Sequence, residues 1–244
     1  MNVVAIIQAR MGSTRLPGKV LRDVAGAPML QRVLARTARS VVKDIMVATT
    51  VSAADDAIVA WCRTEDWSVF RGSEDDVLDR YYHAAAARSA DVVVRITSDC
   101  PLIEPTVVDR VVGEFLDRGD VDYASNAVPR RSFPVGLDTE VMTFEALERA
   151  WREDARPSWR EHVTPYIHRH PELFRRHSVV NDIDYSHLRW TVDAAEDLEF
   201  VRAVYERLGR GDGFSWIDVL QLLDREPALV AINRHVQEKT LAAD

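Results

Sequence analysis

The chain has few of the features that mark secreted, membrane or nucleic-acid-binding proteins. Its 244 residues include two cysteines, Cys62 and Cys100, too few for a disulfide framework. No apolar run approaches the roughly 20 residues that span a bilayer, and no basic segment precedes the first apolar run as in a signal peptide. The net charge of -8 argues against general nucleic-acid binding, which normally needs a basic face. These absences predict a cytoplasmic protein with no membrane and no nucleic-acid partner.

The remaining composition is that of an ordinary globular chain. With 47% hydrophobic and 29% charged residues, it can bury one large core. No linker rich in proline, glycine or serine divides it, and no internal repeat is visible. We therefore expect a single domain over residues 1–244, with a small inserted subdomain at about residues 123–187, where the pattern becomes less regular.

Apolar runs alternate with helical periodicity in the first half of the chain. Buried strands are predicted at residues 3–7, 44–50, 68–72 and 91–97. Helices are predicted at residues 29–37, 55–62, 76–90 and 106–118. Strands that alternate with helices favour an α/β fold with a doubly wound, mostly parallel sheet.

The second half of the chain predicts a mixed set of elements. Strands are expected at residues 123–126, 138–142, 178–180 and 188–193. Helices are expected at residues 144–154, 160–170, 196–208, 216–224 and 228–239. Pro165 lies inside the second of these helices, so it requires a kink or a first-turn position.

The loop after the first strand is small and basic. It places three cations, Arg10, Arg15 and Lys19, among glycine, serine and threonine. Backbone N–H groups and cations at the carboxyl end of a buried strand can hold a phosphate chain. The alternative is a solvated basic loop. The stretch lacks both the Rossmann glycine pattern and the Gly-Lys-Ser/Thr ending of a Walker loop.

Two aspartates follow predicted strands at the edge where this loop is expected. Asp99 follows the strand at residues 91–97, and Asp193 closes the strand at residues 188–193. Magnesium typically takes one or two carboxylates and completes its shell with phosphate oxygens and water, so the pair predicts a magnesium–nucleotide site. Taken singly, Asp99 also fits a turn before Pro101, and Asp193 fits the N-cap of the next helix.

Other polar groups carry a weaker signal. Asp120-Val121-Asp122 and Asp182-Ile183-Asp184 have the Asp-x-Asp form that metal-dependent glycosyltransferases use. Their polar surroundings favour surface loops instead. Cys100 has no neighbouring group that would activate it as a nucleophile, so we interpret it as a packing residue.

Seven segments occur in order along the chain: IIQARMGSTRLPGKVL, DVLDRYY, VVRITSDCPLIEP, YASN, FPVGLDTEV, REHVTPYI and LRWTVDAAEDLEFVRAVYE. Together they resemble the spore-coat-polysaccharide type of cytidylyltransferase, a group related to the 3-deoxy-manno-octulosonate and acylneuraminate cytidylyltransferases. The resemblance implies a Rossmann-like nucleotide-diphospho-sugar-transferase fold. It also implies Mg²⁺-dependent transfer of CMP from CTP to a sugar, sugar-acid or phosphorylated acceptor, with release of pyrophosphate, for cell-surface polysaccharide synthesis.

The resemblance also implies roles for individual residues. It assigns nucleotide contacts to Ala9, Arg10, Gly12, Ser13, Thr14, Arg15 and Lys19, and catalytic roles to Arg10, Lys19 and Asp99. It places Arg71, Gly72 and Asp75 at the cytosine, Asp99 and Asp193 on the metal, and Arg130, Arg131, Asp138 and Glu140 at the acceptor. A homodimer through the subdomain is a further expectation from the family.

Two other functions stay open at this point. One is a glycosyltransferase that consumes a preformed sugar nucleotide, and the Asp-x-Asp strings would serve it. The other is a non-catalytic nucleotide-binding subunit, which would bind CTP without turnover.

Overall fold

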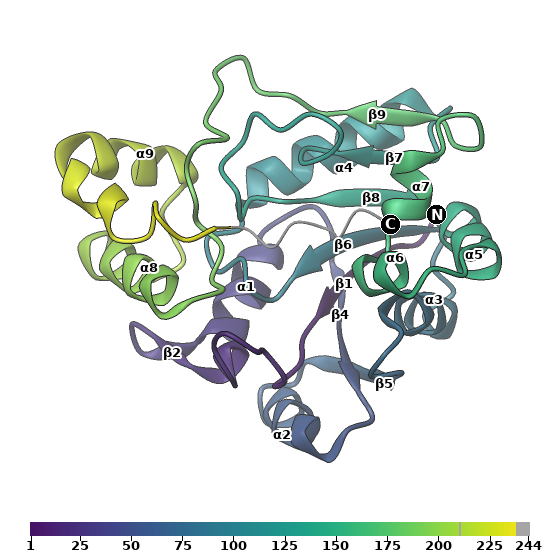
Figure 1. Cartoon of the computed structure of the whole chain (residues 1–244), viewed down its shortest axis with the longest axis horizontal. Helices are drawn as coiled ribbons and strands as arrows, with labels where there is room; N and C mark the ends of the chain where they lie inside the picture. The colour runs from purple at the N-terminus through teal and green to yellow at the C-terminus, as the bar shows by residue number, and fades with distance from the viewer. Residues whose placement is uncertain (210, 238–244) are drawn as a thin grey trace.

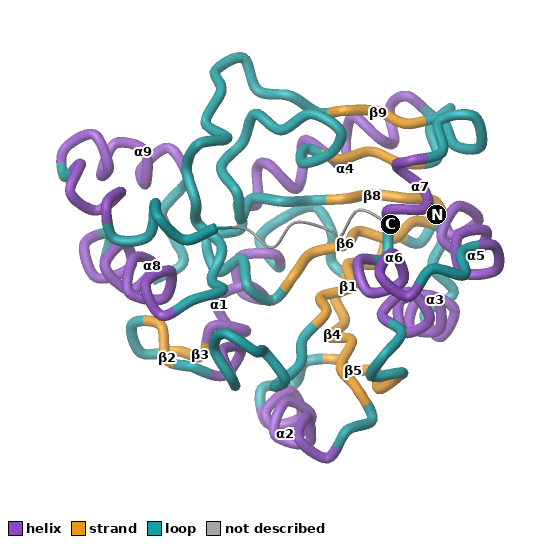
Figure 2. The backbone as a smooth tube through the Cα atoms, viewed as in Figure 1, coloured by secondary structure: helices purple, strands orange, loops and turns teal. Residues whose placement is uncertain are grey.

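A seven-stranded sheet forms the centre of the computed structural model, which describes residues 1–209 and 211–237 (Figure 1; Figure 2). Its strand order is β5-β4-β1-β6-β8-β7-β9. The strands are β1 (Val3–Gln8), β4 (Asp44–Thr50), β5 (Ser68–Gly72), β6 (Val92–Thr97), β7 (Tyr123–Ser125), β8 (Glu140–Thr143) and β9 (Arg176–Ser178). A separate ribbon pairs β2 (Asp23–Val24) with β3 (Ala27–Pro28).

The sheet is mostly parallel, as predicted. β5, β4, β1 and β6 are parallel neighbours, and β7 runs parallel to β9. β8 is the exception, because it pairs antiparallel with both β6 and β7. The first residue of β8, Glu140, therefore lies opposite Arg95 and Ser125, near the carboxyl ends of β6 and β7. The loop between β7 and β8 thus begins and ends at the edge where β1 and β6 also end.

Helices cover both faces of the sheet (Figure 1). They are α1 (Met29–Thr37), α2 (Asp56–Thr64), α3 (Val77–Ala87), α4 (Pro105–Arg118), α5 (Phe144–Glu153), α6 (Pro157–His162), α7 (Pro165–Arg169), α8 (Ala195–Arg207) and α9 (Trp216–Arg225), with short 3-10 helices η1 (Lys19–Leu21), η2 (Ala53–Asp55) and η3 (Pro227–Ala231). In β1, Ala5 and Ile7 pack into a core with α1, α4 and α8, whereas Val4 and Ile6 pack into a second core with α3 and α5. Burial on both faces explains the continuous apolar run of this strand.

Two predicted helices are wrong in extent. The single helix expected at residues 160–170 is two short helices, α6 and α7. Pro165 begins α7, in the first-turn position where its missing N–H removes no intrahelical bond. Within the described residues, the helix expected at residues 228–239 is only η3, and positions 238 and 239 lie outside that description.

The strand predicted at residues 188–193 is also wrong as a sheet strand. The segment is buried, but its only bridge joins Arg189 to Val135. Its backbone bonds to two loops instead: Trp190 N donates to Val135 O at 2.7 Å, and Val192 N donates to Asp99 O at 2.8 Å. β9 begins two residues before the strand expected at residues 178–180.

The predicted subdomain shares the central sheet with the rest of the chain. It contributes β7, β8 and β9, and its helices α5 and α7 pack into the core on the α3 face. The division at about residues 123–187 therefore stays a prediction, as does the homodimer expected through it. Among the helices of the described residues, none is long and apolar enough to span a membrane.

The loop between β7 and β8 packs tightly against the segment at residues 188–191. Asn126 closes the base of the loop, since its side chain donates to Leu137 O at 2.7 Å and accepts from Thr139 N at 2.8 Å. Gly136 has a φ of 106°, and a Cβ added there would lie 2.6 Å from Thr191 N. Both the backbone conformation and the close approach of two chain segments therefore require glycine.

We expect Gly136→Ala to lower the free energy of unfolding by about 1–3 kcal/mol, the range for a residue held in a sparsely populated backbone conformation. Urea denaturation measures this loss. Gly113→Ala is the matched control, because Gly113 lies within α4 and a Cβ added there meets no atom within 4 Å. The control is expected to gain roughly 0.5–1 kcal/mol. Equal effects at both positions would contradict the close-approach argument.

Candidate active site

The basic loop leaves β1 at the edge where the parallel strands end. Ala9 N donates to Ala48 O of β4 at 3.1 Å, which extends the strand pairing by one bond. Met11 N then donates to the carboxylate of Asp55 at 2.7 Å. Asp55 is buried and also accepts from Thr50 N at 3.2 Å, so it ties the basic loop to the end of β4. Sequence reasoning placed Asp55 only at a helix start and missed this contact.

The rest of the loop turns back on itself before Lys19. Ser13 N and Gly18 N both donate to Met11 O at 2.9 Å. Gly18 has a φ of 68°, a left-handed conformation that glycine adopts without strain. This turn leads directly into η1, whose first residue is Lys19. The local fold therefore directs Lys19 inward, whereas Arg10, on the same loop, is exposed.

The Lys19 ammonium group bridges the two predicted metal ligands. Its Nζ lies 3.0 Å from Asp99 Oδ2 and 3.0 Å from Asp193 Oδ1, and it donates to Val192 O at 2.7 Å. Lys19 is only 9% exposed, while the two carboxylate side chains are about one-quarter exposed. The structure thus brings together Lys19, Asp99 and Asp193. Each aspartate contacts the lysine, although it lies 80 or more positions away from it in the sequence.

The backbone around Asp99 explains why the two aspartates meet. Asp99 follows β6, and its carbonyl oxygen accepts from Val192 N at 2.8 Å and from Thr191 Oγ1 at 3.2 Å. These bonds place the next residue, Asp193, beside Asp99. The backbone N–H groups of Asp193 and Ala194 donate to the carboxylate of Asp197. The N-cap of α8 is Ala194, so the alternative role of Asp193 as the N-cap is wrong.

Charge dominates the protonation of this cluster. Burial would lower the pKa of Lys19, but the charges of Asp99 and Asp193 outweigh it and raise this pKa above its ordinary value. Burial would raise the pKa of Asp193, but Lys19, Arg189 and Arg15 together hold it below its ordinary value. The lysine is therefore charged and Asp193 is ionised at neutral pH.

Of the two arginines of the loop, Arg15 contacts the cluster and Arg10 pairs with another helix. Arg15 Nη2 lies 3.0 Å from Asp193 Oδ2, and Arg15 Nη1 donates to Gln237 O at 3.1 Å. Arg10 Nη2 lies 3.7 Å from Glu161 Oε1 of α6, and its side chain is 44% exposed. Gly12 and Thr14 are exposed on the same loop. The arrangement leaves cationic and small residues facing solvent around the Lys19 cluster.

The cluster has the donor set of a magnesium site that shares its shell with a ligand. Within residues 1–209 and 211–237, no group of three His, Cys, Asp or Glu side chains could hold a metal ion by itself. Asp99 and Asp193 are two carboxylates that already share one cationic partner, Lys19. Two carboxylates fit a hard cation that takes its other ligands from phosphate oxygens and water. Asp99 and Asp193 are therefore the residues that could hold Mg²⁺.

Arg71, Gly72 and Asp75 lie at the end of β5, on the far side of the basic loop from β6. Arg71 donates to two carbonyl oxygens of the neighbouring loop, Thr50 O and Ser52 O, each at 2.9 Å. Gly72 is the last residue of β5, and Asp75 is exposed in the turn that follows. The Arg71 side chain thus supports the loop after β4. Contact of these three residues with a nucleobase stays a prediction.

Three of the four predicted acceptor residues lie on the loop between β7 and β8. Arg130 is exposed, while Arg131 and Asp138 form a double ion pair across the loop, with Nη2 and Oδ2 2.9 Å apart. Burial and the charges of Asp99 and Asp138 raise the pKa of the Cys100 thiol well above its ordinary value. A protonated, buried thiol agrees with the packing role predicted for Cys100.

The structure does not bring Glu140 to this group. Its carboxylate is buried and forms an ion pair with Arg95 and a hydrogen bond from Tyr123. Thr164 Oγ1 donates to it at 2.6 Å. Burial would raise the pKa of Glu140, but Arg95, Thr164 and Tyr123 together hold it below its ordinary value. These partners occupy the carboxylate, so we give Glu140 a structural role where the loop between β7 and β8 enters β8.

The two Asp-x-Asp strings do not join the Lys19 cluster. Asp122 precedes β7, at the amino edge of that strand, and pairs with Arg175 at 2.8 Å. Asp182 and Asp184 are exposed, and Asp184 accepts a hydrogen bond from Ser186 N at 2.8 Å, as in a polar turn. The surface-loop interpretation therefore fits both strings.

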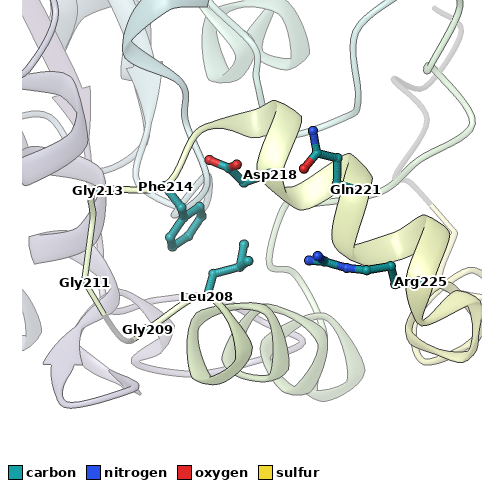
Figure 3. Close-up of a pocket in the computed structure, with 8 residues that line it drawn as sticks. All are labelled: Leu208, Gly209, Gly211, Gly213, Phe214, Asp218, Gln221 and Arg225. Atoms are coloured by element: carbon teal, nitrogen blue, oxygen red, sulfur yellow. The ribbon is translucent and has the colours of Figure 1, made fainter.

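A hollow between α8 and α9 lies outside the predicted site (Figure 3). Its lining residues are Leu208, Gly209, Gly211, Gly213, Phe214, Asp218, Gln221 and Arg225. Asp218 is already engaged at the start of α9, where it accepts from Ser215 N at 2.7 Å. None of the residues predicted for nucleotide, metal or acceptor lines this hollow, so it adds nothing to the site.

Residues 4–206 match the sequence profile of a family described as cytidylyltransferase. This chain belongs to the cytidylyltransferase family. The match begins in β1 and ends in α8, so it includes the basic loop, Asp99 and Asp193. The resemblance proposed from the seven segments is confirmed, and so is the prediction of a nucleotidyltransferase.

Individual relatives of this cytidylyltransferase support the same family assignment. It is 35% identical over 235 residues to the spore coat polysaccharide biosynthesis protein SpsF of Bacillus subtilis, covering 93% of this chain and 95% of the relative. It is 42% identical over 115 residues to the 3-deoxy-manno-octulosonate cytidylyltransferase of Geobacter sulfurreducens, covering 46% and 44% of the two chains. A solved cytidylyltransferase from Leptospira borgpetersenii superposes with a TM-score of 0.90 at 33% identity, covering 98% of this chain and 100% of that one.

We expect Glu140→Gln to lower the free energy of unfolding by about 3–5 kcal/mol, because it leaves Arg95 buried without its counter-charge. Urea denaturation at neutral pH measures this. The lowered pKa of Glu140 means that this stabilisation is present above the pKa of the unfolded state and is lost as the pH falls through the folded-state pKa, so the difference from wild type shrinks in acid.

Asp138→Asn is the matched control for Glu140→Gln. It removes a carboxylate two positions earlier, in the loop before β8, but its pair with Arg131 is partly exposed. An exposed pair contributes about 0–1 kcal/mol, so the control should stay near wild type. A stable Glu140→Gln protein would contradict the structural role.

We expect Lys19→Met to raise the affinity for Mn²⁺ about tenfold in the absence of nucleotide, because the metal no longer competes with an ammonium between Asp99 and Asp193. Titration followed by electron paramagnetic resonance measures free Mn²⁺. Lys43→Met is the control, because Lys43 bonds only to backbone carbonyls of the turn after α1, at 2.7 and 3.2 Å. Unchanged Mn²⁺ affinity in Lys19→Met would place the metal elsewhere.

Proposed function

We propose that this cytidylyltransferase moves CMP from CTP to a sugar, sugar-acid or phosphorylated acceptor, with Mg²⁺ as cofactor and pyrophosphate as the second product. The observation that carries this proposal is the Lys19 bridge between Asp99 and Asp193 at the edge of the sheet where β1 and β6 end. A nucleoside triphosphate with its metal needs this combination of cations for phosphate and carboxylates for metal.

The basic loop would bind the triphosphate. Arg10 and Arg15 can hold phosphate oxygens bidentately, and the backbone N–H groups near Gly12 and Thr14 add neutral donors. The exposure of Arg10, Gly12 and Thr14 supports this role, since a ligand can reach them. Ala9 and Ser13 belong to the same turn and would contribute through the backbone. The cytosine would then lie toward Arg71, Gly72 and Asp75, across the loop from Asp99.

Asp99 and Asp193 would hold Mg²⁺, which supplies positive charge against the phosphate oxygens when bound. Lys19 lies within 3.0 Å of both carboxylates, so it would share their charge with the metal and remain close to the phosphates. A lysine in this position can neutralise charge that develops as pyrophosphate leaves. This assigns catalytic roles to Arg10, Lys19 and Asp99.

The acceptor would enter from the loop between β7 and β8. Arg130, Arg131 and Asp138 lie there, and the antiparallel β8 returns this loop to the edge that carries the Lys19 cluster. An acceptor oxygen held on this side could attack the α-phosphorus in line while the bond to the pyrophosphate oxygen breaks. The main contributions of the chain would be to orient the two substrates and to neutralise their charge.

The two alternative functions have less support. A glycosyltransferase would need an Asp-x-Asp string at the nucleotide, but Asp122 pairs with Arg175 at the opposite edge of β7. A non-catalytic subunit would not need the catalytic combination of Lys19, Asp99 and Asp193. We further propose cytoplasmic synthesis of a cell-surface polysaccharide precursor by a homodimer. The name of the SpsF relative supports the polysaccharide, and the family expectation supports the dimer.

The experiment is a pyrophosphate-release assay with CTP and a panel of sugars, sugar acids and phosphorylated sugars, with and without Mg²⁺. We expect CTP-dependent and Mg²⁺-dependent release with at least one acceptor. Asp99→Asn should lower turnover roughly 10²–10³-fold, because a carboxylate ligand of the metal is lost at the reacting centre. Circular dichroism checks that the variant remains folded.

Asp122→Asn serves as the control and should retain wild-type turnover, because Asp122 lies at the other edge of the sheet. Release of a nucleoside diphosphate from a sugar nucleotide would favour the glycosyltransferase. Tight CTP binding without turnover on any acceptor would favour the non-catalytic subunit. Turnover in Asp99→Asn equal to wild type would remove Asp99 from the mechanism.

A further inference from the structure

A buried ion network lies directly behind Asp193. Arg189 Nη2 donates to Asp193 Oδ2 at 2.8 Å, and the same guanidinium bonds Asp197 through Nε at 2.9 Å and Nη2 at 3.0 Å. Asp197 Oδ2 also accepts from Asp193 N at 2.9 Å. Asp197 is fully buried and Arg189 is 9% exposed. Both the backbone and the carboxylate of Asp193 are thus held by this pair.

A residue near the C-terminus completes the network. Asn233 lies just beyond η3, and its side-chain amide donates to Asp197 Oδ1 at 2.9 Å and to Arg189 O at 3.0 Å. Asn233 is 2% exposed, so solvent cannot take over these two bonds. Its amide therefore fixes the Asp197 carboxylate and the Arg189 backbone relative to each other.

The same C-terminal segment reaches the front of the site. Gln237 O accepts from Arg15 Nη1 at 3.1 Å, and Arg15 also lies 3.0 Å from Asp193 Oδ2. The segment from Asn233 to Gln237 therefore contacts the partners of Asp193 at two points. The family match ends at residue 206, before this segment begins.

We propose that Asn233 is a positioning residue for the metal-binding carboxylate of Asp193, acting through Asp197 and Arg189. The inference rests on the proposed function, because it takes Asp193 as a metal ligand. Groups that orient a metal ligand set metal affinity, since a ligand that must be ordered on binding binds less tightly. Without the Asn233 amide, Asp197 keeps Arg189 and two backbone donors but loses one of the two hydrogen bonds to Oδ1, the other being from Arg189 Nε.

The test is Mn²⁺ binding to the full-length protein with saturating CTP and no acceptor, followed by electron paramagnetic resonance. We expect Asn233→Ala to weaken Mn²⁺ binding about tenfold, the lower end of the effect of removing such an orienting group. CTP affinity measured without metal should be unchanged. Asn233→Asp, which has the same shape but adds a carboxylate beside Asp197, should weaken Mn²⁺ binding at least as much.

A second variant keeps the test decisive if Asn233→Ala folds poorly. Arg189→Lys retains the positive charge but lacks the fork that bonds Asp193 and Asp197 together, so it should also weaken Mn²⁺ binding about tenfold. Asn2→Ala is the matched control. It removes a part-buried amide hydrogen bond, from Asn2 Nδ2 to Arg88 O at 2.8 Å, at the opposite end of β1, and should leave Mn²⁺ binding unchanged.

The outcomes separate this inference from the proposed function. Wild-type protein that binds no Mn²⁺, or binds it equally well after Asp99→Asn, would overturn the proposed metal site itself. Wild-type binding that depends on Asp99 but is unchanged in folded Asn233→Ala and Arg189→Lys would overturn the positioning role alone. A loss of thermal stability in Asn233→Ala without a change in Mn²⁺ affinity would make Asn233 a purely structural residue.

Discussion

The site depends on one interaction, the contact of the Lys19 ammonium group with two carboxylates. Two partly buried carboxylates, Asp99 and Asp193, lie against it, and without a cation between them their charges would repel. The lysine therefore joins the loop after β1, the turn after β6 and the start of α8. It also holds the carboxylates at one place on the sheet edge, where a divalent cation and a phosphate chain could meet.

Reversal of one strand brings a second loop to that edge of the sheet. Because β8 runs antiparallel to β6, the loop between β7 and β8 starts and ends at the edge that carries Lys19. The buried pair of Glu140 with Arg95 anchors the point where this loop enters β8. Gly136 lets the loop lie directly against the segment that leads to Asp193. The loop between β7 and β8 and the segment that leads to Asp193 are thus connected through backbone contacts.

Much of the fold was predictable from local pattern, because buried strands and amphipathic helices leave periodic apolar residues. The basic loop and the positions of Asp99 and Asp193 after extended segments were visible for the same reason. Glu140 was predicted at the acceptor beside Asp138, but its partner in the structure is Arg95, which lies opposite it only through the sheet register. Pro165 begins a second short helix where a single helix was predicted. The segment at residues 188–193 bonds to loops, whereas a strand of the sheet was expected there.

By itself, the sequence determined the alternation of elements, the family and the residue types of the site, since these depend on neighbours a few positions apart. Only the tertiary structure decided which charges meet. Packing between distant segments holds Lys19 against Asp193 and Asn233 against Asp197. No local sequence pattern predicts such a contact. Hydrogen bonds and ion pairs act over about 3 Å in space. The separation of two residues along the sequence therefore does not predict these contacts, which form only once the sheet and its loops have folded.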